Sequence, residues 1–390
     1  MRWMTSSLDV CIRGSGAVGL SLALALARQG LQVGLVGLVG AAWADAALAD
    51  AASASAGAGD VRAYALNAAS RSLLLGLKVW DALPADAVTA VDDMHIEGDA
   101  AGAAIDFSAW RAGVEALAWI VDAAELEAAL RTAARFAPHL QWLTPAEADA
   151  APAALCVLAE GKASASRSAL GVQFDLHAYG HSALAARLVA SEPHTGLALQ
   201  WFRHPDVLAL LPFDRPQPAC SYGLVWSLPA ERAAALQAAP VAEFEAALND
   251  ATGAAAGQLR LASTRAAWPL ALARADRLCG PGWVLVGDAA HLVHPLAGQG
   301  LNLGLADVAS LARVIAGREP WRALGDETLL RRHERERAGP TQAMTLVTDG
   351  LLHLFAQPQP GIRELRNRGM SLLNRIAPIK RALIQRALDA

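Results

Sequence analysis

Cysteine is scarce in this chain of 390 residues, and the few that occur form no motif. The four cysteines, at positions 11, 156, 220 and 279, are scattered without a C-x-x-C pair. This spacing argues against the disulfide framework of a small secreted protein and against a cysteine-based zinc site. It favours a reducing compartment, and we expect the protein in the cytoplasm.

An excess of basic charge is missing as well. Charged residues make up 18% of the chain, the formal net charge is −4 and the isoelectric point is near 6.2. Proteins that bind nucleic acid usually carry a basic patch, so we expect no nucleic-acid partner. The histidines and acids show no metal-ligand spacing such as H-E-x-x-H, and we expect no metal site.

Long uncharged apolar runs are absent too. No such run approaches the roughly 18 residues that predict a membrane-spanning helix. The apolar stretch AVGLSLALALA at residues 17–27, together with Arg2, leaves a signal peptide open as an alternative. The strand-like run and the spaced glycines in front of that stretch favour a helix of the folded protein.

The start of the chain alternates between strand-like and helix-like segments. A short buried strand is followed by an apolar helix at about residues 17–28 and a second strand at residues 31–36. Gly14, Gly16 and Gly19 spell G-x-G-x-x-G between the first strand and the helix. In this setting the glycines permit a tight turn and a close approach to a pyrophosphate, which lies on the helix N-terminus. The start of the chain therefore predicts dinucleotide binding.

One part of that fingerprint is missing. The acid that binds the adenosine ribose should end the second strand, where this chain has Gly37. Asp45 or Asp50 could replace it only if the Ala-, Ser- and Gly-rich segment that follows folds back. We therefore expect the adenosine end of the site to bind more loosely or to be built differently.

A second Gly-rich stretch, GDAAHLVHPLAGQGLNLG, occupies residues 287–304. Its first residues, Gly287 and Asp288, follow an apolar run that predicts a buried strand. Its last residues lead into a helical pattern that continues from Leu301.

Together with AEGKASASR at residues 159–167, the two Gly-rich stretches resemble the flavoprotein aromatic hydroxylases of the para-hydroxybenzoate hydroxylase type. The sequence is most similar to the FAD-dependent hydroxylases of ubiquinone biosynthesis, and the likeness extends over nearly the whole chain, including RAYALNAAS at residues 62–70. The resemblance implies an α/β (α+β) fold. It combines a Rossmann-like FAD-binding domain, an inserted β-rich substrate domain and a C-terminal helical region.

The order of the predicted elements fits a nucleotide domain that is interrupted by a β-rich insertion. We expect the discontinuous FAD-binding domain at residues 1–90, 122–168 and 277–350, the substrate domain at residues 91–121 and 169–276, and C-terminal amphipathic helices at residues 351–390.

The resemblance implies roles for residues outside the flavin loop. Asp288, after Gly287, matches the aspartate that binds the ribityl chain of FAD, and Arg62 matches an arginine that approaches the FAD phosphates. Glu160 and Gly161 stand where the family has Asp-Gly, so the carboxylate is one methylene farther from the backbone. A turn cap at position 288 and a solvated arginine at position 62 are the alternative interpretations.

The resemblance also places a loop along the flavin ring, from Pro295 to Asn302. Gly298 and Gly300 would be small because the ring lies close to the backbone there. The N–H groups of Leu301 and Asn302 would face the pyrimidine edge of the ring, where a helix N-terminus stabilises the negative charge of reduced flavin.

His291 and Pro295 are the candidates for catalytic residues. Histidine can act as a general base near neutral pH. In the resembling family, however, His291 belongs to a structural element around the flavin loop, and this interpretation stays open beside the catalytic one.

The implied activity is that of an FAD-dependent monooxygenase. NAD(P)H would reduce the FAD, and a C4a-hydroperoxide would hydroxylate an aromatic ring, with a polyprenylated phenol precursor of ubiquinone as the expected substrate. The β-rich region, including Trp201, Phe202 and Leu211, would supply an apolar substrate wall or ordinary sheet core. A monooxygenase of a small soluble aromatic compound and a non-catalytic scaffold member of a quinone-biosynthesis complex are the alternatives.

Residues 361–390 combine seven basic side chains with apolar residues at helical spacing. Such a segment can lie on an anionic membrane surface, which would suit a polyprenylated substrate and a peripheral position at the inner membrane. Packing of these helices on the protein, with a solvated basic face, is the equal alternative.

Overall fold

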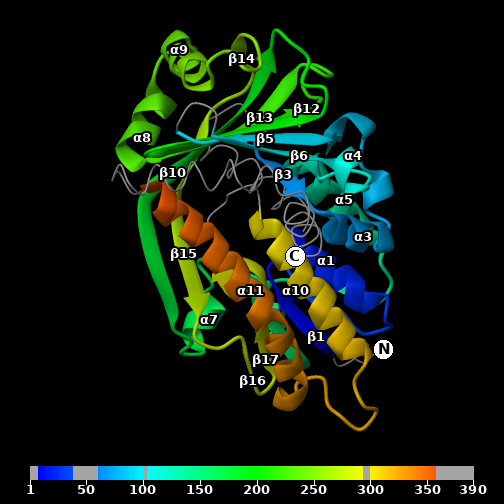
Figure 1. Ribbon diagram of the computed structural model, residues 1–390. Coiled ribbons are helices and arrows are strands. Elements are labelled where there is room, and N and C mark those ends of the chain that lie inside the picture. The colour runs from blue at the N-terminus through cyan, green and yellow to red at the C-terminus, as the bar shows by residue number, and fades with distance from the viewer. Residues whose placement is uncertain (1–7, 38–59, 100–102, 293–298, 357–390) are drawn as a thin grey trace.

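The computed structural model describes residues 8–37, 60–99, 103–292 and 299–356, and it is a mixed α/β fold as expected (Figure 1). Its first sheet has six strands in the order β16-β17-β9-β1-β2-β8, all joined in parallel except β16. These strands are β1 (Leu8–Arg13), β2 (Val33–Val36), β8 (Leu140–Leu143), β9 (Ala153–Leu158), β16 (Cys279–Gly280) and β17 (Trp283–Leu285).

The second sheet has nine strands, mostly antiparallel, and the third has three. The nine are β5 (Asp93–Glu97), β6 (Ala104–Ser108), β10 (Phe174–Ala190), β11 (Leu197–Arg203), β12 (Asp206–Phe213), β13 (Ser221–Pro229), β14 (Leu259–Leu261), β15 (Ala266–Ala275) and β18 (His291–Leu292). The three are β3 (Ala63–Leu66), β4 (Val88–Val91) and β7 (Ala118–Asp122), in the order β3-β7-β4.

Helices cover the sheets and join them. They are α1 (Ala17–Ala27), α3 (Ala68–Gly76), α4 (Ala109–Ala112), α5 (Ala123–Phe136), α6 (Pro145–Ala150), α7 (Ala165–Ala169), α8 (Ala230–Ala238), α9 (Val241–Thr252), α10 (Gln299–Ala316) and α11 (Glu327–Ala356). Short 3₁₀ turns are η1 (Trp80–Ala82), η2 (Ala85–Ala87) and η3 (Gly287–Ala289).

The first strand, helix and second strand appear where the sequence predicts them, as β1, α1 and β2. The start of α5 is capped by a side chain. The side chain of Asp122 accepts hydrogen bonds from the N–H groups of Ala124 (2.9 Å) and Glu125 (3.3 Å), which satisfies two donors at the helix N-terminus.

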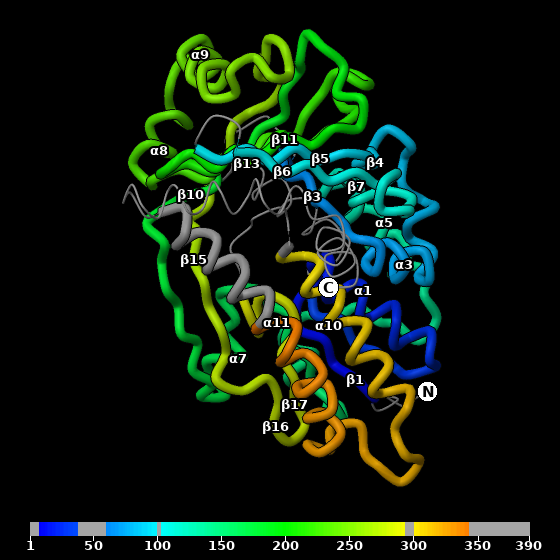
Figure 2. The backbone as a smooth tube through the Cα atoms, in the orientation of Figure 1, coloured from blue at the N-terminus to red at the C-terminus, as the bar shows by residue number. Residues whose placement is uncertain are grey.

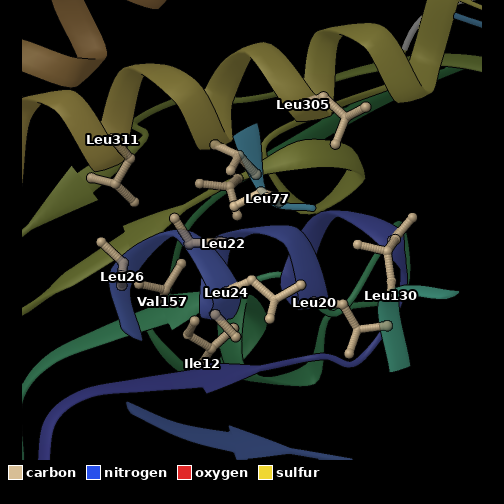
Figure 3. Packing of buried hydrophobic residues seen from close by; sticks show 14 of the residues in the cluster. Ile12, Leu20, Leu22, Leu24, Leu26, Leu77, Leu130, Val157, Leu305 and Leu311 are labelled. Atoms are coloured by element: carbon tan, nitrogen blue, oxygen red, sulfur yellow. The ribbon is translucent and has the colours of Figure 1, made fainter. Parts of the chain in front are cut away.

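The main core lies between the six-stranded sheet and helices α1 and α10 (Figure 3). Leu22 and Leu26 of α1 pack with Ile12 of β1 and Leu311 of α10 in this cluster. α1 is apolar on nearly all sides, because the sheet covers one side of it and α10 another. This packing holds the Gly-rich turn before α1 rigidly against the rest of the domain.

The nine-stranded sheet has two differently covered faces. Helices α8 and α9 cover one face, with Trp226 and Phe244 in the shared core. The opposite face packs toward the three-stranded sheet through residues such as Ala198, Ala209 and Phe213. Strands β11, β5 and β6 lie side by side along one edge (Figure 2). Because strand residues alternate between faces, neighbouring residues of one strand enter different cores.

No helix within the described ranges is long and apolar enough to cross a membrane. α11 continues to Ala356, so it includes the first part of the predicted C-terminal helical region. The basic segment 361–390 lies outside the described residues.

Candidate functional site

The three sequence motifs meet at one edge of the six-stranded sheet. Gly14 follows β1, Glu160 follows β9, and Gly287 follows β17. These three strands are parallel neighbours in the order β17-β9-β1. Ligands of open α/β sheets bind outside the carboxyl ends of the strands, so the motifs gather where such a site is expected.

The G-x-G-x-x-G motif, which comprises the turn before α1 and the first turn of that helix, is packed so tightly that two of its glycines cannot be replaced without movement. Gly14 has φ +118°, and a Cβ on it would lie 2.2 Å from the carbonyl oxygen of Ala159. A Cβ on Gly19 would lie 1.9 Å from the carbonyl oxygen of Gly14. Gly16 differs, because a Cβ there would meet no atom of the described residues within 4 Å.

Gly16 is also the N-cap of α1, and no side chain of a described residue caps the N–H groups of the first turn. That turn carries no acidic residue either. An uncapped helix N-terminus that opens to solvent is suited to an anion such as a pyrophosphate. This end of the site therefore fits the phosphates of FAD.

The missing acid at Gly37 has a packing reason. A Cβ on Gly37 would lie 2.6 Å from the hydroxyl oxygen of Ser15, within the Gly-rich turn, and 3.0 Å from the ring of Trp142. A larger residue at position 37 would have to displace Ser15. The glycine that departs from the dinucleotide fingerprint therefore leaves the space that Ser15 occupies. Asp45 and Asp50 lie outside the described residues.

The carboxylate of Glu160 faces α7. It accepts hydrogen bonds from the hydroxyls of Ser164 (2.5 Å) and Ser166 (2.8 Å) and from the N–H of Ser166 (3.1 Å). Gly161 follows with φ +73°. Both residues lie beside the Gly-rich turn, but the oxygens of Glu160 are already engaged, and contact with the cofactor remains a prediction for both.

Arg167 joins the middle motif to the Gly-Asp turn. Its guanidinium donates to the carbonyl oxygens of Ala289 (3.0 Å) and Lys162 (2.9 Å) and lies 3.6 Å from the ring centre of Phe174. The side chain is buried, and this burial lowers its pKa against the opposing attraction of Glu160. Arg167 therefore links the segment after β9 to the Gly-Asp turn after β17.

Asp288 is the exposed residue of a buried turn. Gly287 and Ala289 are buried in η3, whereas the side chain of Asp288 is open to solvent. Although the side chain is accessible, the protein packed around it partly desolvates the carboxylate and raises the pKa of Asp288, while the positive charges of His291, Lys162 and Arg62 oppose that rise. An accessible carboxylate at this position fits the acceptor that the ribityl hydroxyls of FAD require.

His291 is turned toward α10. Its Nε2 lies 2.8 Å from Oδ2 of Asp307, which also accepts a hydrogen bond from the N–H of Gly287 (2.9 Å). Oδ1 of Asp307 accepts from Nε of Arg337 in α11 (2.7 Å), and all three side chains are buried. This cluster fixes the Gly-Asp turn against both helices.

The same cluster shifts both pKa values. Burial lowers the pKa of His291, but the attraction of Asp307 and their hydrogen bond outweigh it, so the pKa lies above its ordinary value. Burial raises the pKa of Asp307, but His291 and Arg337 lower it more, so Asp307 stays ionised. These contacts support a positioning role for His291.

Asn302 anchors the start of α10. Its Oδ1 accepts hydrogen bonds from the N–H of Asn67 (3.0 Å) and the hydroxyl of Ser70 (2.8 Å), and its Nδ2 donates to the carbonyl oxygen of Ala65 (2.8 Å). Asn302 is 1% exposed. The backbone of the first turn, including Leu301, is thereby held against the segment between β3 and α3.

The remaining predicted residues divide into three groups. Gly300 lies in the first turn of α10, where a Cβ would meet no atom within 4 Å among the residues that the structure describes. Pro295 and Gly298 lie outside the described residues. Arg62 is bound by Asp60, with Nε 2.8 Å from Oδ1, and lies 3.6 Å from Glu127, so a phosphate would have to compete with two carboxylates.

A cavity of about 90 Å³ adjoins the start of α10. It lies between the nine-stranded sheet and the three-stranded sheet, and Asn302 and Ala65 form its wall on the side of α10. Among the described lining residues none is ionisable. Such a cavity suits a neutral, largely apolar ring.

Only part of the expected apolar wall lines this cavity. Leu211 does, whereas Trp201, Leu210 and Trp226 pack on the opposite face of the sheet with α8 and α9. Phe202 packs in a separate small cluster with Val207. The reason is the two-residue alternation of strands, which sends neighbouring apolar residues to opposite faces.

Several residues of the site were not singled out from the sequence. Asp307 could have been noticed as an acid in the apolar pattern of α10, and Gln200 as an amide in an apolar strand. Arg337 offered no such signal, because it lies 30 positions after Asp307 and the sequence gave no reason to pair them.

Comparison with known proteins gives concordant results. Residues 111–348 match the family described as FAD binding domain. The ubiquinone hydroxylase UbiL of Rhodospirillum rubrum is 29% identical over 399 residues, covering 97% of this chain and 89% of that protein. The 3-demethoxyubiquinol 3-hydroxylase of Escherichia coli is 29% identical over 405 residues, covering 97% and 98%.

Solved structures share the fold at lower identity. PqsL, a probable FAD-dependent monooxygenase of Pseudomonas aeruginosa, superposes with a TM-score of 0.71 at 20% identity, covering 94% of this chain and 99% of that one. HpxO of Klebsiella pneumoniae, solved with FAD and uric acid, gives a TM-score of 0.68 at 18% identity, covering 97% of each chain.

Proposed function

The chain belongs to the FAD binding domain family that its residues 111–348 match, and from that premise we propose that it hydroxylates a polyprenylated phenol in ubiquinone biosynthesis. It is an FAD-dependent aromatic hydroxylase by family and by the relatives found over nearly its full length. The names of these relatives, a ubiquinone hydroxylase and a demethoxyubiquinol hydroxylase, support a quinone precursor as the substrate.

One observation carries the proposal. The three motifs lie at the carboxyl ends of three neighbouring parallel strands, and an apolar cavity adjoins the start of α10 beside them. A cofactor at the strand ends and a substrate ring in the cavity would then share the first turn of α10.

The residues have distinct tasks in this proposal. The uncapped start of α1 would hold the pyrophosphate, and Asp288 would accept hydrogen bonds from the ribityl chain. The N–H groups of Leu301 and Asn302 would stabilise negative charge on the ring system. Bound FAD supplies the redox chemistry, taking electrons from NAD(P)H and activating dioxygen.

The cavity would exclude water from the reacting ring. Its described lining is apolar apart from three amide side chains, and the sheet behind it is part of a packed core. Exclusion of water protects a reactive oxygen species from unproductive decay. His291 would act by holding the Gly-Asp turn through Asp307.

The direct test is to purify the protein and record its flavin absorbance. We expect bound FAD and dioxygen-dependent hydroxylation with NADH or NADPH. A colourless protein that FAD cannot reconstitute would overturn the proposal. A strain that lacks the protein should accumulate a quinone precursor that lacks one ring hydroxyl group. If the quinones of that strain were unchanged, the assignment to ubiquinone biosynthesis would be rejected.

For substrate delivery we propose that residues 361–390 bind an anionic membrane surface. Their basic and apolar residues support this, although the segment lies outside the described residues. Co-sedimentation with phosphatidylglycerol vesicles should fall when the segment is deleted, and equal sedimentation of both proteins would reject the idea.

A further inference from the structure

The cavity beside α10 contains one polar side chain, that of Gln200, whose amide has no hydrogen-bond partner in the described part of the chain. We propose that Gln200 of β11 recognises an uncharged oxygen substituent of the substrate ring, and that the cavity selects neutral phenols over aromatic carboxylates. This inference rests on the proposed function and names its substrate class more closely.

The first support is the position of Gln200. It is 8% exposed and lines the cavity from the middle of β11, between β5 and β12. Its register partner on β12 is Ala209, and Ala198 lies two residues before it on the same face. These small neighbours leave space in front of the amide, and the two flanking strands hold its backbone rigidly.

The second support is that the other two amide side chains in the described lining already have hydrogen-bond partners. Asn302 uses both atoms of its amide in hydrogen bonds to Ala65, Asn67 and Ser70. The Oδ1 of Asn67 accepts from the N–H of Ser70 and caps α3. The side-chain amide of Gln200, in contrast, makes no hydrogen bond to any described residue.

The amide of Gln200 faces the cavity and has no partner among the described residues, so it can bond water or a ligand that enters the cavity. A ligand that displaces water from this amide has to offer a donor or an acceptor in return, because an amide left unpaired costs free energy. Hydroxyl, methoxy and carbonyl groups all meet this requirement, because an amide both donates and accepts.

The third support is the absence of ionisable side chains from the described lining. A carboxylate that enters an apolar cavity without a cation loses its hydration without compensation. A neutral ring avoids this loss. Ala65 and Asn302 face the cavity from the side of α10, so a ring held by Gln200 would present a defined carbon to the cofactor side. Gln200 would thereby influence which ring position reacts.

The test is calorimetric titration of the FAD-loaded protein with three probes: 2-methoxyphenol, toluene and 4-hydroxybenzoate. We expect 2-methoxyphenol to bind tightest. Gln200→Met, which keeps the length of the side chain, should weaken that binding about three- to tenfold and leave toluene unchanged. Gln141→Met, at an exposed position of β8, is the matched control.

A second variant guards against a folding defect. Ala209→Leu should fill the cavity and weaken all three probes while flavin content stays that of the parent protein. Equal affinity of Gln200→Met and the parent for 2-methoxyphenol, or tightest binding of 4-hydroxybenzoate, would overturn the inference. Retention of probe binding in Ala209→Leu would likewise overturn it, because the probes would then bind elsewhere.

The outcomes separate this inference from the proposed function. Binding that depends on Gln200, in a protein that never hydroxylates a ring, would remove the proposed function and keep the binding site. If Gln200→Met bound the substrate with the affinity of the parent protein and hydroxylated the same ring position, the proposed function would stand and the role of Gln200 would be rejected.

Discussion

At the residue scale, the site depends on where single charges are exposed and where they are buried. Asp288 is open to solvent, whereas Asp307, nineteen residues later, is buried with His291 and Arg337 around it. The exposed acid is available to a ligand, and the buried one holds the turn that carries it. The acid within the Gly-rich stretch and the acid three residues after it thus have different tasks.

Asp288→Asn should weaken FAD binding roughly 10- to 100-fold. A hydrogen bond to a charged group contributes about 1.5–3 kcal/mol, and the amide keeps the shape while losing the charge. Flavin fluorescence titration of the apoprotein measures the dissociation constant. Asp81→Asn, at an exposed position of η1, is the control, and equal affinity of both variants would contradict the assignment of Asp288.

The protonation of His291 should make stability depend on pH. Because its pKa is higher in the folded state than in the unfolded chain, protonation stabilises the fold. This contribution is complete below the ordinary pKa of about 6.5 and is lost as the pH rises through the folded value.

The melting temperature tests this. The difference between the protein and His291→Gln should be largest near about pH 6 and should shrink toward about pH 9. His177→Gln, at an exposed position of β10, should show no such trend. A difference that stays constant over this range would contradict the raised pKa.

At the element scale, the site is built from the ends of strands and the starts of helices. α1 and α10 pack against each other near Val18, where Cβ atoms on Gly287 and Gly304 would lie 3.3 Å and 2.6 Å from its methyl groups. Small residues at these positions let two helices and a turn approach closely. The close packing brings both Gly-rich stretches to the same place.

Two alanine substitutions in the Gly-rich turn should behave differently. Gly19→Ala should lower the free energy of unfolding by about 1–3 kcal/mol, because its Cβ would collide with the carbonyl oxygen of Gly14. Gly16→Ala should fold normally but bind FAD more weakly, because its Cβ points into the open space where a pyrophosphate would lie.

Chemical denaturation and flavin titration separate the two effects. Gly76→Ala, where a Cβ at the end of α3 would meet no atom of the described chain within 4 Å, should change neither. If Gly16→Ala bound FAD as tightly as the parent protein, the pyrophosphate would not lie at the start of α1.

At the scale of the whole molecule, Arg187 connects the nine-stranded sheet to the segments that carry the site. From β10 it donates to the carbonyl oxygen of Arg62 (2.6 Å) and to Oδ2 of Asp122 (3.2 Å). Its guanidinium lies 4.1 Å from the ring centre of Phe213, beside the cavity. The side chain is buried, and burial lowers its pKa.

Arg187→Met should lower the free energy of unfolding by about 3 kcal/mol, because Asp122 then loses its buried partner. Arg260→Met, at an exposed position of β14, is the control. Urea denaturation followed by tryptophan fluorescence measures both. A loss no larger than that of the control would show that the sheets are held together by apolar packing alone.

The sequence by itself determined the order of the elements and the motifs after three strands. β1, α1, β2 and the cap at Asp122 follow from local patterns, because glycines, apolar periodicity and N-cap residues act within a few positions. The FAD-dependent hydroxylase family also followed from the motifs and is confirmed by the family match.

Only the tertiary structure decided which partners these residues have. Glu160 bonds to the start of α7, Gly37 packs against Ser15, and His291 pairs with Asp307. No local sequence pattern indicates that these residues are neighbours. The same holds for the cavity, since strand alternation sorted the apolar residues of one sheet onto two faces and left Gln200 facing open space. Long-range packing sets these contacts, so they could be found only once the chain was folded.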